Sequence, residues 1–178
     1  MAVEYSRFQR TAHSVRCWLP RHPLRAGRYA IPLNVEPETW NTIQMHPTTL
    51  TQQLEAEGTT VHRVGIIMNG VTGRMGTNQH LKRSIMGIIE EGGLPLPSGD
   101  VIVPDPMLVG RNPAKLRHLS EETGIDNWTT DVEEALADPT YPVYFDAQVT
   151  DLRYPSVKKA IAAGKHIYCE KPAALTTD

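Results

Sequence analysis

The 178-residue chain has the composition of a globular protein of about one domain, with 40% hydrophobic residues, 21% charged residues and a formal net charge of -2. The charge is near balance and no lysine- or arginine-rich tract carries interleaved aromatic residues, so the sequence disfavours a nucleic-acid partner and attachment to acidic membranes. No apolar stretch has the length of a membrane span, and the N-terminus lacks the apolar core of a secretory signal. We therefore expect a cytoplasmic protein that binds small solutes, with Cys17 and Cys169 as free thiols.

Residues 1–60 show no sustained helical or strand period, and proline, arginine and histidine are scattered through them. We expect a poorly ordered extension, or translated sequence upstream of a later start such as Met45. Its arginine-rich beginning loosely resembles an organelle transit peptide, without the serine richness or the amphipathic face of one. The stretch "TTLTQQLEAEG", residues 48–58, is compatible with a short helix before the ordered domain begins.

From Val61 onward, apolar runs alternate with segments of helical period, a pattern typical of strand-helix units that build a parallel sheet. The expected elements, in chain order, are a strand at 61–68, a helix at 75–91, a proline-rich insertion with a short edge strand at 101–103, a core strand at 107–110, a helix from 113, a short strand near 128, a helix through 132–137, a strand at 143–149, a helix at 155–163 and a strand at 166–170. Right-handed crossovers turn this order into an α/β fold with a doubly wound parallel (Rossmann) sheet, which binds ligands beyond the carboxyl ends of its strands.

Helix caps support these boundaries. Asn112 precedes Pro113, a residue suited to the first helical turn, and Gly124 follows the same helix. Thr130 or Asp131 opens the next helix, and Gly164 closes the last one.

The segment "GVTGRMG", residues 70–76, follows the first strand and precedes the first helix. Gly70 supplies a positive φ for the turn, Gly73 lets the backbone approach a bulky ligand, and Gly76 allows the helix to pack closely. The N–H groups and positive dipole end of that helix then face an anion such as a pyrophosphate. We predict dinucleotide binding rather than a structural turn, with contacts from the whole segment: Gly70, Val71, Thr72, Gly73, Arg74, Met75 and Gly76.

The residues after the second core strand bear on the choice of dinucleotide. An NAD site usually has an aspartate or glutamate there, whereas an arginine can accommodate the 2′-phosphate of NADP. This chain has Arg111 and Asn112, so we predict NADP in preference to NAD; the alternative is that Arg111 is a solvated surface residue.

A second motif, "AGKHIYCEKPAALT" at residues 163–176, combines a glycine-closed helix, a strand and Glu-Lys-Pro. Together with "VGIIMNGVTGRMG", "WTTDVEEALADP" and "VYFDAQVT", it resembles the N-terminal nucleotide-binding domain of the glucose-fructose oxidoreductase / inositol dehydrogenase / rhizopine catabolism (Gfo/Idh/MocA) family over residues 61–178. The resemblance implies a Rossmann domain that binds NAD or NADP, and hydride transfer to or from a sugar, cyclitol or related hydroxyl or carbonyl compound.

The same resemblance assigns roles to residues of this sequence. Lys171 of Glu-Lys-Pro would lie near the nicotinamide and the substrate, where an ammonium group stabilises negative charge developing on oxygen. Glu170 would orient or pair with Lys171; a surface ion pair is the alternative for both. Gln148, Val149 and Thr150 match the stretch that lines the cofactor cleft.

The sequence also departs from the family. The usual Thr-Pro-Asn-x-x-His is replaced by "VTDLRYPS", with Arg153 near the position of the histidine. We also expect these 178 residues to lack the second α/β domain that, in the family, supplies most substrate contacts. The chain is therefore expected to bind a polyhydroxylated substrate only if a second domain is supplied. A non-catalytic nucleotide-binding module and an inactive fragment stay open, and "GRMG" also resembles dihydrodipicolinate reductases. We predict no metal site, because no metal-ligand spacing relates His62, His80, His118 and His166.

Overall fold

The computed structural model describes residues 46–176, so residues 1–45 of the extension expected at 1–60, Cys17 among them, lie outside the described residues. The described part begins with α1 (Pro47–Ala56), the short helix expected there. Leu50 of α1 is buried in the same core as the sheet. The folded unit thus includes residues N-terminal to Val61, where the sequence analysis placed the start of the domain.

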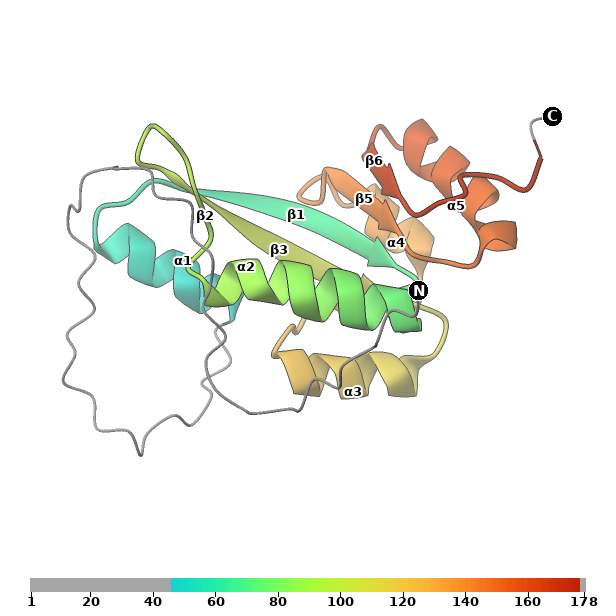
Figure 1. Cartoon of the computed structure of the whole chain (residues 1–178), viewed down its shortest axis with the longest axis horizontal. Helices are drawn as coiled ribbons and strands as arrows, with labels where there is room; N and C mark the ends of the chain where they lie inside the picture. The colour runs from blue at the N-terminus through green and yellow to red at the C-terminus, as the bar shows by residue number, and fades with distance from the viewer. Residues whose placement is uncertain (1–45, 177–178) are drawn as a thin grey trace, which may run out of the picture. The chain divides into compact units, whose positions relative to one another are not determined.

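A six-stranded sheet forms the centre of the fold (Figure 1). Its strands are β1 (Val61–Asn69), β2 (Leu94–Pro95), β3 (Val101–Val109), β4 (Trp128–Thr129), β5 (Val143–Asp146) and β6 (His166–Cys169). They lie in the order β2-β3-β1-β5-β6, with β4 also paired to β3. All pairs are parallel except that of β2 with β3. The sequence order reverses between β1 and β5, which confirms the predicted doubly wound sheet.

Helices cover both faces of the sheet (Figure 1). One core cluster joins the sheet to α1, the π-helix η2 (Gly76–Met86), its continuation α2 (Gly87–Glu90) and α3 (Pro113–Thr123). The other joins it to α4 (Val132–Ala137) and α5 (Thr150–Ala162). The predicted caps are present: the side chain of Asn112 accepts from the backbone N–H of Lys115, that of Asp131 from two N–H groups of α4, and Gly124 is left-handed with φ 71°. None of the helices in residues 46–176 has the length and apolar character required to cross a membrane.

The prediction for residues 101–110 is wrong in one respect. The sequence pattern predicts a proline-rich insertion with an edge strand at 101–103 and a separate core strand at 107–110, but residues 101–109 form one strand that pairs with β1 along its whole length. The backbone N–H of Val101 donates toward β1 and that of Leu108 toward β4, so Pro104 and Pro106 have their nitrogens on the side away from β1. Over that stretch neither β2 nor β4 pairs with β3, so the prolines cost no hydrogen bond of the sheet.

A second correction concerns the region after β5. This strand ends at Asp146 rather than 149, and α5 begins at Thr150 rather than near Pro155, which lies inside the helix. Pro155 removes one helical N–H donor, a loss that would normally place the boundary there. However, the first turn of α5, which precedes Pro155, contains Arg153. The side chain of Arg153 is buried and has three hydrogen-bond partners, which hold this turn in place. Tertiary contacts of one side chain therefore outweigh the local preference of proline.

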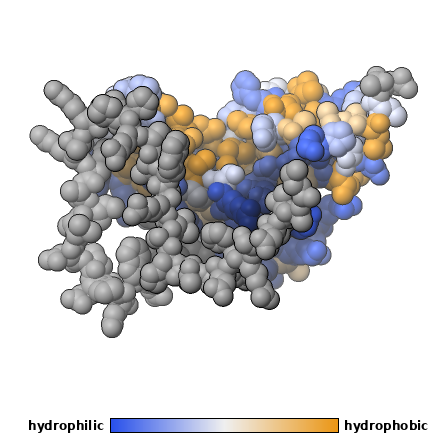
Figure 2. Space-filling view, in the orientation of Figure 1, coloured by the Kyte–Doolittle hydropathy of each residue, from blue (hydrophilic) through white to orange (hydrophobic). Residues whose placement is uncertain are grey.

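Hydrophobic side chains reach the surface along β6 and α5 (Figure 2). Tyr168 of β6 and Ile161 of α5 are each more than 60% exposed, as is Leu175 beyond the last strand. The β6 edge of the sheet therefore presents apolar side chains to its surroundings.

Candidate functional site

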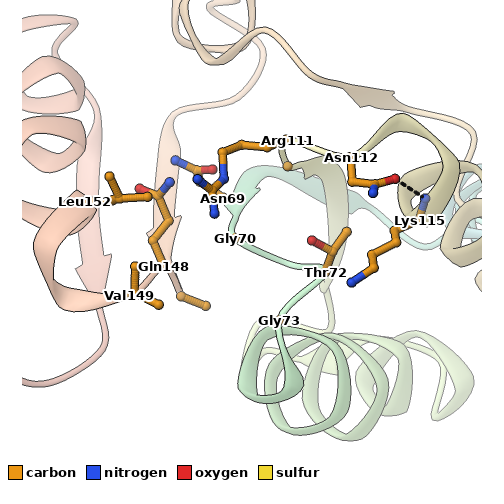
Figure 3. Close-up of a pocket in the computed structure, with 12 residues that line it drawn as sticks. Asn69, Gly70, Thr72, Gly73, Arg111, Asn112, Lys115, Gln148, Val149 and Leu152 are labelled. Atoms are coloured by element: carbon orange, nitrogen blue, oxygen red, sulfur yellow. Dashed lines mark hydrogen bonds between the residues drawn. The ribbon is translucent and has the colours of Figure 1, made fainter.

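A cleft of about 460 Å³ lies at the carboxyl ends of β1, β3 and β5, where the strand order reverses (Figure 3). This is the place at which open α/β sheets bind their ligands. The residues that line it come from the last residue of β1, the loops after these three strands and the first turns of α3 and α5: Asn69, Gly70, Thr72, Gly73, Gly110, Arg111, Asn112, Lys115, Ala147, Gln148, Val149 and Leu152.

The loop after β1 has the geometry expected for its first glycine. Gly70 adopts φ 79°, and its N–H donates to the carbonyl of Val109 at 3.0 Å, which fixes the loop to the end of β3. A Cβ atom at Gly70 would lie 2.7 Å from the backbone nitrogen of Gln148. Only glycine fits here, because both the conformation and the space exclude a side chain.

The other two glycines of the loop differ in what surrounds them. A Cβ at Gly76 would lie 2.7 Å from the carbonyl oxygen of Gly70, so this glycine allows the helix to pack against the loop. A Cβ at Gly73 would meet only that same oxygen, at 3.3 Å, and Gly73 lines the cleft. Gly73 therefore borders the space available to a ligand.

The loop after β1 forms one wall of the cleft, and polar and cationic groups that follow β3 form a second wall. Arg111, Asn112 and Lys115 are exposed and line the cleft, with Lys115 in the first turn of α3 (Figure 3). The twelve lining residues contain no carboxylate, so the fixed charges of the cleft are positive. Sequence reasoning missed Lys115, although its position within one helical turn of the Asn112 cap was a signal that it shares the mouth of the cleft.

The loop after β5 forms the third wall, and it contains a buried hydrogen-bond acceptor without a partner. The backbone N–H of Gln148 donates to Asp146 at 3.1 Å, but its side-chain oxygen Oε1 is buried without a hydrogen-bond partner, the only such side-chain atom found within residues 46–176. A buried acceptor without a partner is unfavourable in the free protein. Because Gln148 lines the cleft, a ligand that donates a hydrogen bond would relieve this cost.

A buried polar network supports this wall from behind. Asn69 Nδ2 donates to the hydroxyl of Tyr144 at 2.7 Å, and that hydroxyl donates to Asp146 Oδ2 at 3.1 Å. Burial raises the pKa of Tyr144, so the hydroxyl stays protonated and remains a donor. Arg153 Nε donates to Asp146 Oδ1 at 3.1 Å, which completes a buried ion pair. The network ties the carboxyl ends of β1 and β5 to the start of α5.

The Glu-Lys-Pro segment lies outside the twelve lining residues. Lys171 is exposed. The carboxylate of Glu170 contacts His80 of η2 and also accepts from the backbone N–H of Lys171, at 3.3 Å. Glu170 therefore orients the backbone at Lys171, while its carboxylate also contacts the side chain of His80 in η2.

The structure thus brings together part of the predicted site. The predicted residues that line the cleft are Gly70, Thr72, Gly73, Arg111, Asn112, Gln148 and Val149. Those that do not are Val71, Arg74, Met75, Gly76, Thr150, Glu170 and Lys171. Among these, the side chain of Val71 is buried in the core, and Thr150 lines a separate depression together with Leu175. No cluster of three or more His, Cys, Asp or Glu side chains suited to a metal ion occurs between residues 46 and 176.

Comparisons with known proteins agree with this geometry. Residues 106–178 match the family model GFO_IDH_MocA, described as an oxidoreductase family with an NAD-binding Rossmann fold. Over 115 residues the chain is 49% identical to a D-xylose dehydrogenase of Paenarthrobacter nicotinovorans, a match that covers 65% of this chain and 30% of that protein. Over 57 residues it is 39% identical to a 1,5-anhydro-D-fructose reductase of Ensifer adhaerens, covering 32% of this chain and 17% of that one.

A solved structure is also similar. A levoglucosan dehydrogenase in complex with NADH and levoglucosan superposes with a TM-score of 0.52 at 26% sequence identity, over 64% of this chain and 29% of that one. The matched part of this chain spans less than a third of the length of each of these relatives.

Proposed function

Because this chain carries the NAD-binding Rossmann domain of the Gfo/Idh/MocA oxidoreductase family, we propose that its cleft binds NADP(H) in preference to NAD(H). The observation that carries the proposal is that Gly73, where an added Cβ would have only the Gly70 carbonyl oxygen within 4 Å, lines a cleft whose fixed charges are positive. A pyrophosphate is the anion that such a glycine loop accommodates, since the N-terminus of a helix favours negative charge through its backbone N–H groups and the positive end of its dipole.

The preference for NADP rests on the wall formed after β3. Arg111 and Lys115 are both exposed there, without a neighbouring carboxylate in the cleft lining to take the ribose hydroxyls. A guanidinium binds a phosphate through paired hydrogen bonds, and an ammonium adds a second charge. Arg111 would therefore hold the 2′-phosphate, supported by Lys115.

The opposite wall would hold the nicotinamide end. Gln148 Oε1 offers an acceptor there, and Val149 lies 65% exposed beside it. When bound, the dinucleotide supplies or accepts the hydride. Lys171, after β6, would stabilise negative charge that develops on a substrate oxygen.

We place the complete reaction in a longer polypeptide that contains a substrate domain. The names of the relatives, D-xylose dehydrogenase, 1,5-anhydro-D-fructose reductase and levoglucosan dehydrogenase, favour a sugar or a related polyhydroxylated compound as the substrate class. Dinucleotide binding without turnover by that longer polypeptide would favour the alternative of a nucleotide-binding module.

Calorimetric titration of the purified chain with NADPH and, separately, NADH tests the cofactor. We expect both to bind, with NADPH tighter, and Arg111→Ala to weaken NADPH binding by about tenfold while changing NADH binding by less than about twofold. Arg117→Ala is the matched control, because Arg117 is an exposed arginine of α3 outside the cleft lining, and it should change neither affinity. Equal weakening of both ligands by Arg111→Ala would contradict the 2′-phosphate role.

The unpartnered acceptor of Gln148 leads to a separate prediction. Gln148→Leu should leave the stability of the free chain unchanged or raise it, because it removes a buried oxygen that has no partner. The same variant should weaken dinucleotide binding by about three- to tenfold, the worth of one hydrogen bond. Urea unfolding and titration measure the two effects. A loss of stability with unchanged affinity would show that the oxygen serves the fold rather than the ligand.

A further inference from the structure

One buried side chain links the cleft to the Glu-Lys-Pro segment. Arg153 Nη2 donates to the backbone carbonyl of Gln148 at 2.7 Å, and Nη1 donates to the carbonyl of Pro172. The third donor, Nε, holds Asp146. A single guanidinium therefore contacts the end of β5, the cleft wall and the residue that follows Lys171.

The position of Arg153 is determined by its surroundings. Its side chain is 4% exposed and that of Asp146 is fully buried, so the ion pair is shielded from water. A planar guanidinium offers its donors in a fixed fork, so the directions of the three contacts are not independent. A displacement of the Gln148 carbonyl is therefore transmitted to the Pro172 carbonyl through a rigid group.

Few other contacts hold the segment that carries Lys171. The backbone N–H of Glu170 donates to the Asp146 carbonyl at 3.0 Å, and the Glu170 carboxylate contacts His80. These contacts fix the chain before Lys171, whereas Arg153 fixes it immediately afterwards. Both sides of Lys171 are thus tied to groups that belong to, or adjoin, the cleft.

We propose that Arg153 is a positioning residue that sets the location of Lys171 relative to a dinucleotide in the cleft. This inference rests on the proposed function, because it assumes that Lys171 approaches the bound dinucleotide. Arg153 itself does not line the cleft, so its effect on the ligand is exerted through the Gln148 and Pro172 carbonyls.

A double-mutant cycle on the NADPH dissociation constant tests the proposal, using the purified full chain with wild-type sequence, Arg153→Lys, Lys171→Met and both changes together. Arg153→Lys keeps a positive charge beside Asp146 but cannot reproduce the three-way fork. We expect Lys171→Met to weaken binding by about three- to tenfold in the wild-type background and by less than about twofold in the Arg153→Lys background.

The matched control cycle combines Arg153→Lys with Lys115→Met, because Lys115 lines the wall after β3 and has no contact with Arg153 among those found in the structure. Its effect should be the same in both backgrounds within about twofold, as expected for independent sites. If Arg153→Lys does not fold, Asp146→Asn/Arg153→Met replaces it as the perturbed background, since that pair of changes leaves no unpaired buried charge.

The outcomes separate the two proposals. A folded wild-type chain that binds neither NADPH nor NADH contradicts the proposed function. Binding by the wild-type chain, together with an equal effect of Lys171→Met in both backgrounds, overturns the positioning role of Arg153. An effect of Lys171→Met below about twofold in the wild-type background overturns it as well, because Lys171 would then not reach the ligand.

Discussion

Gly70→Ala should destabilise the folded chain by at least about 3 kcal/mol, whereas Gly73→Ala should change its stability by less than about 1 kcal/mol and abolish most of its affinity for a dinucleotide. The two glycines lie in one loop, but the added methyl group meets different surroundings. At Gly70 the backbone has φ 79° and the new Cβ would lie 2.7 Å from a backbone nitrogen of the neighbouring loop. At Gly73 the nearest atom to the new Cβ is the Gly70 carbonyl oxygen, 3.3 Å away, and Gly73 lines the cleft, so the methyl group adds bulk where a ligand would bind.

Urea unfolding of both variants measures the change in stability, and calorimetric titration measures the change in dinucleotide affinity. Gly87→Ala is the matched control, because Gly87 lies inside the continuous helix formed by η2 and α2 and a Cβ there meets nothing within 4 Å. It should stabilise the chain by about 0.5–1 kcal/mol, as alanine does in a helix interior, without changing affinity. A Gly73→Ala variant that binds NADPH as tightly as the wild-type chain would remove the main support for pyrophosphate binding in this loop.

The sheet could be predicted from the sequence wherever local patterns and tertiary packing agree. The strand before "GVTGRMG", the caps at Asn112 and Asp131 and the closing glycine at 124 all lie where their residues placed them. β3 could not be predicted, because the sequence shows Pro104 and Pro106 but not which side of the strand their nitrogens face. Only the pairing with β1 reveals that the missing donors fall where no neighbour needs them.

The candidate site was predictable to a similar extent. Gly70, Gly73 and Arg111 could be assigned from their positions after strands, because the carboxyl ends of parallel strands share one edge of a sheet. The unpartnered oxygen of Gln148 and the buried pair of Asp146 with Arg153 depend on side-chain directions that no spacing encodes. In the sequence Arg153 is only a departure from a family pattern, because its three contacts form only in the folded chain.

The same ion pair gives the second large expected effect, on stability rather than on binding. Arg153→Met should lower the free energy of unfolding by about 3–5 kcal/mol, because it leaves the Asp146 carboxylate buried with no opposite charge. The double replacement Asp146→Asn/Arg153→Met should cost less, about 2–3 kcal/mol, because it leaves no unpaired buried charge. The remaining loss is that of the hydrogen bonds to the Gln148 and Pro172 carbonyls, and of one of the two bonds that Asp146 accepts from the Tyr144 hydroxyl and the Gln148 N–H. Urea unfolding of the three proteins measures the difference.

An exposed ion pair of the same chain supplies the comparison. Lys159 and Glu133 also form an ion pair, but their side chains are 56% and 59% exposed, so Lys159→Met should cost less than about 1 kcal/mol. Added salt should reduce the contribution of that exposed pair and leave the Asp146–Arg153 pair nearly unaffected, because screening requires access of ions to the charges. If Arg153→Met were no more damaging than Lys159→Met, the guanidinium could not hold the Gln148 and Pro172 carbonyls in place, and its proposed control of Lys171 would lose its physical basis.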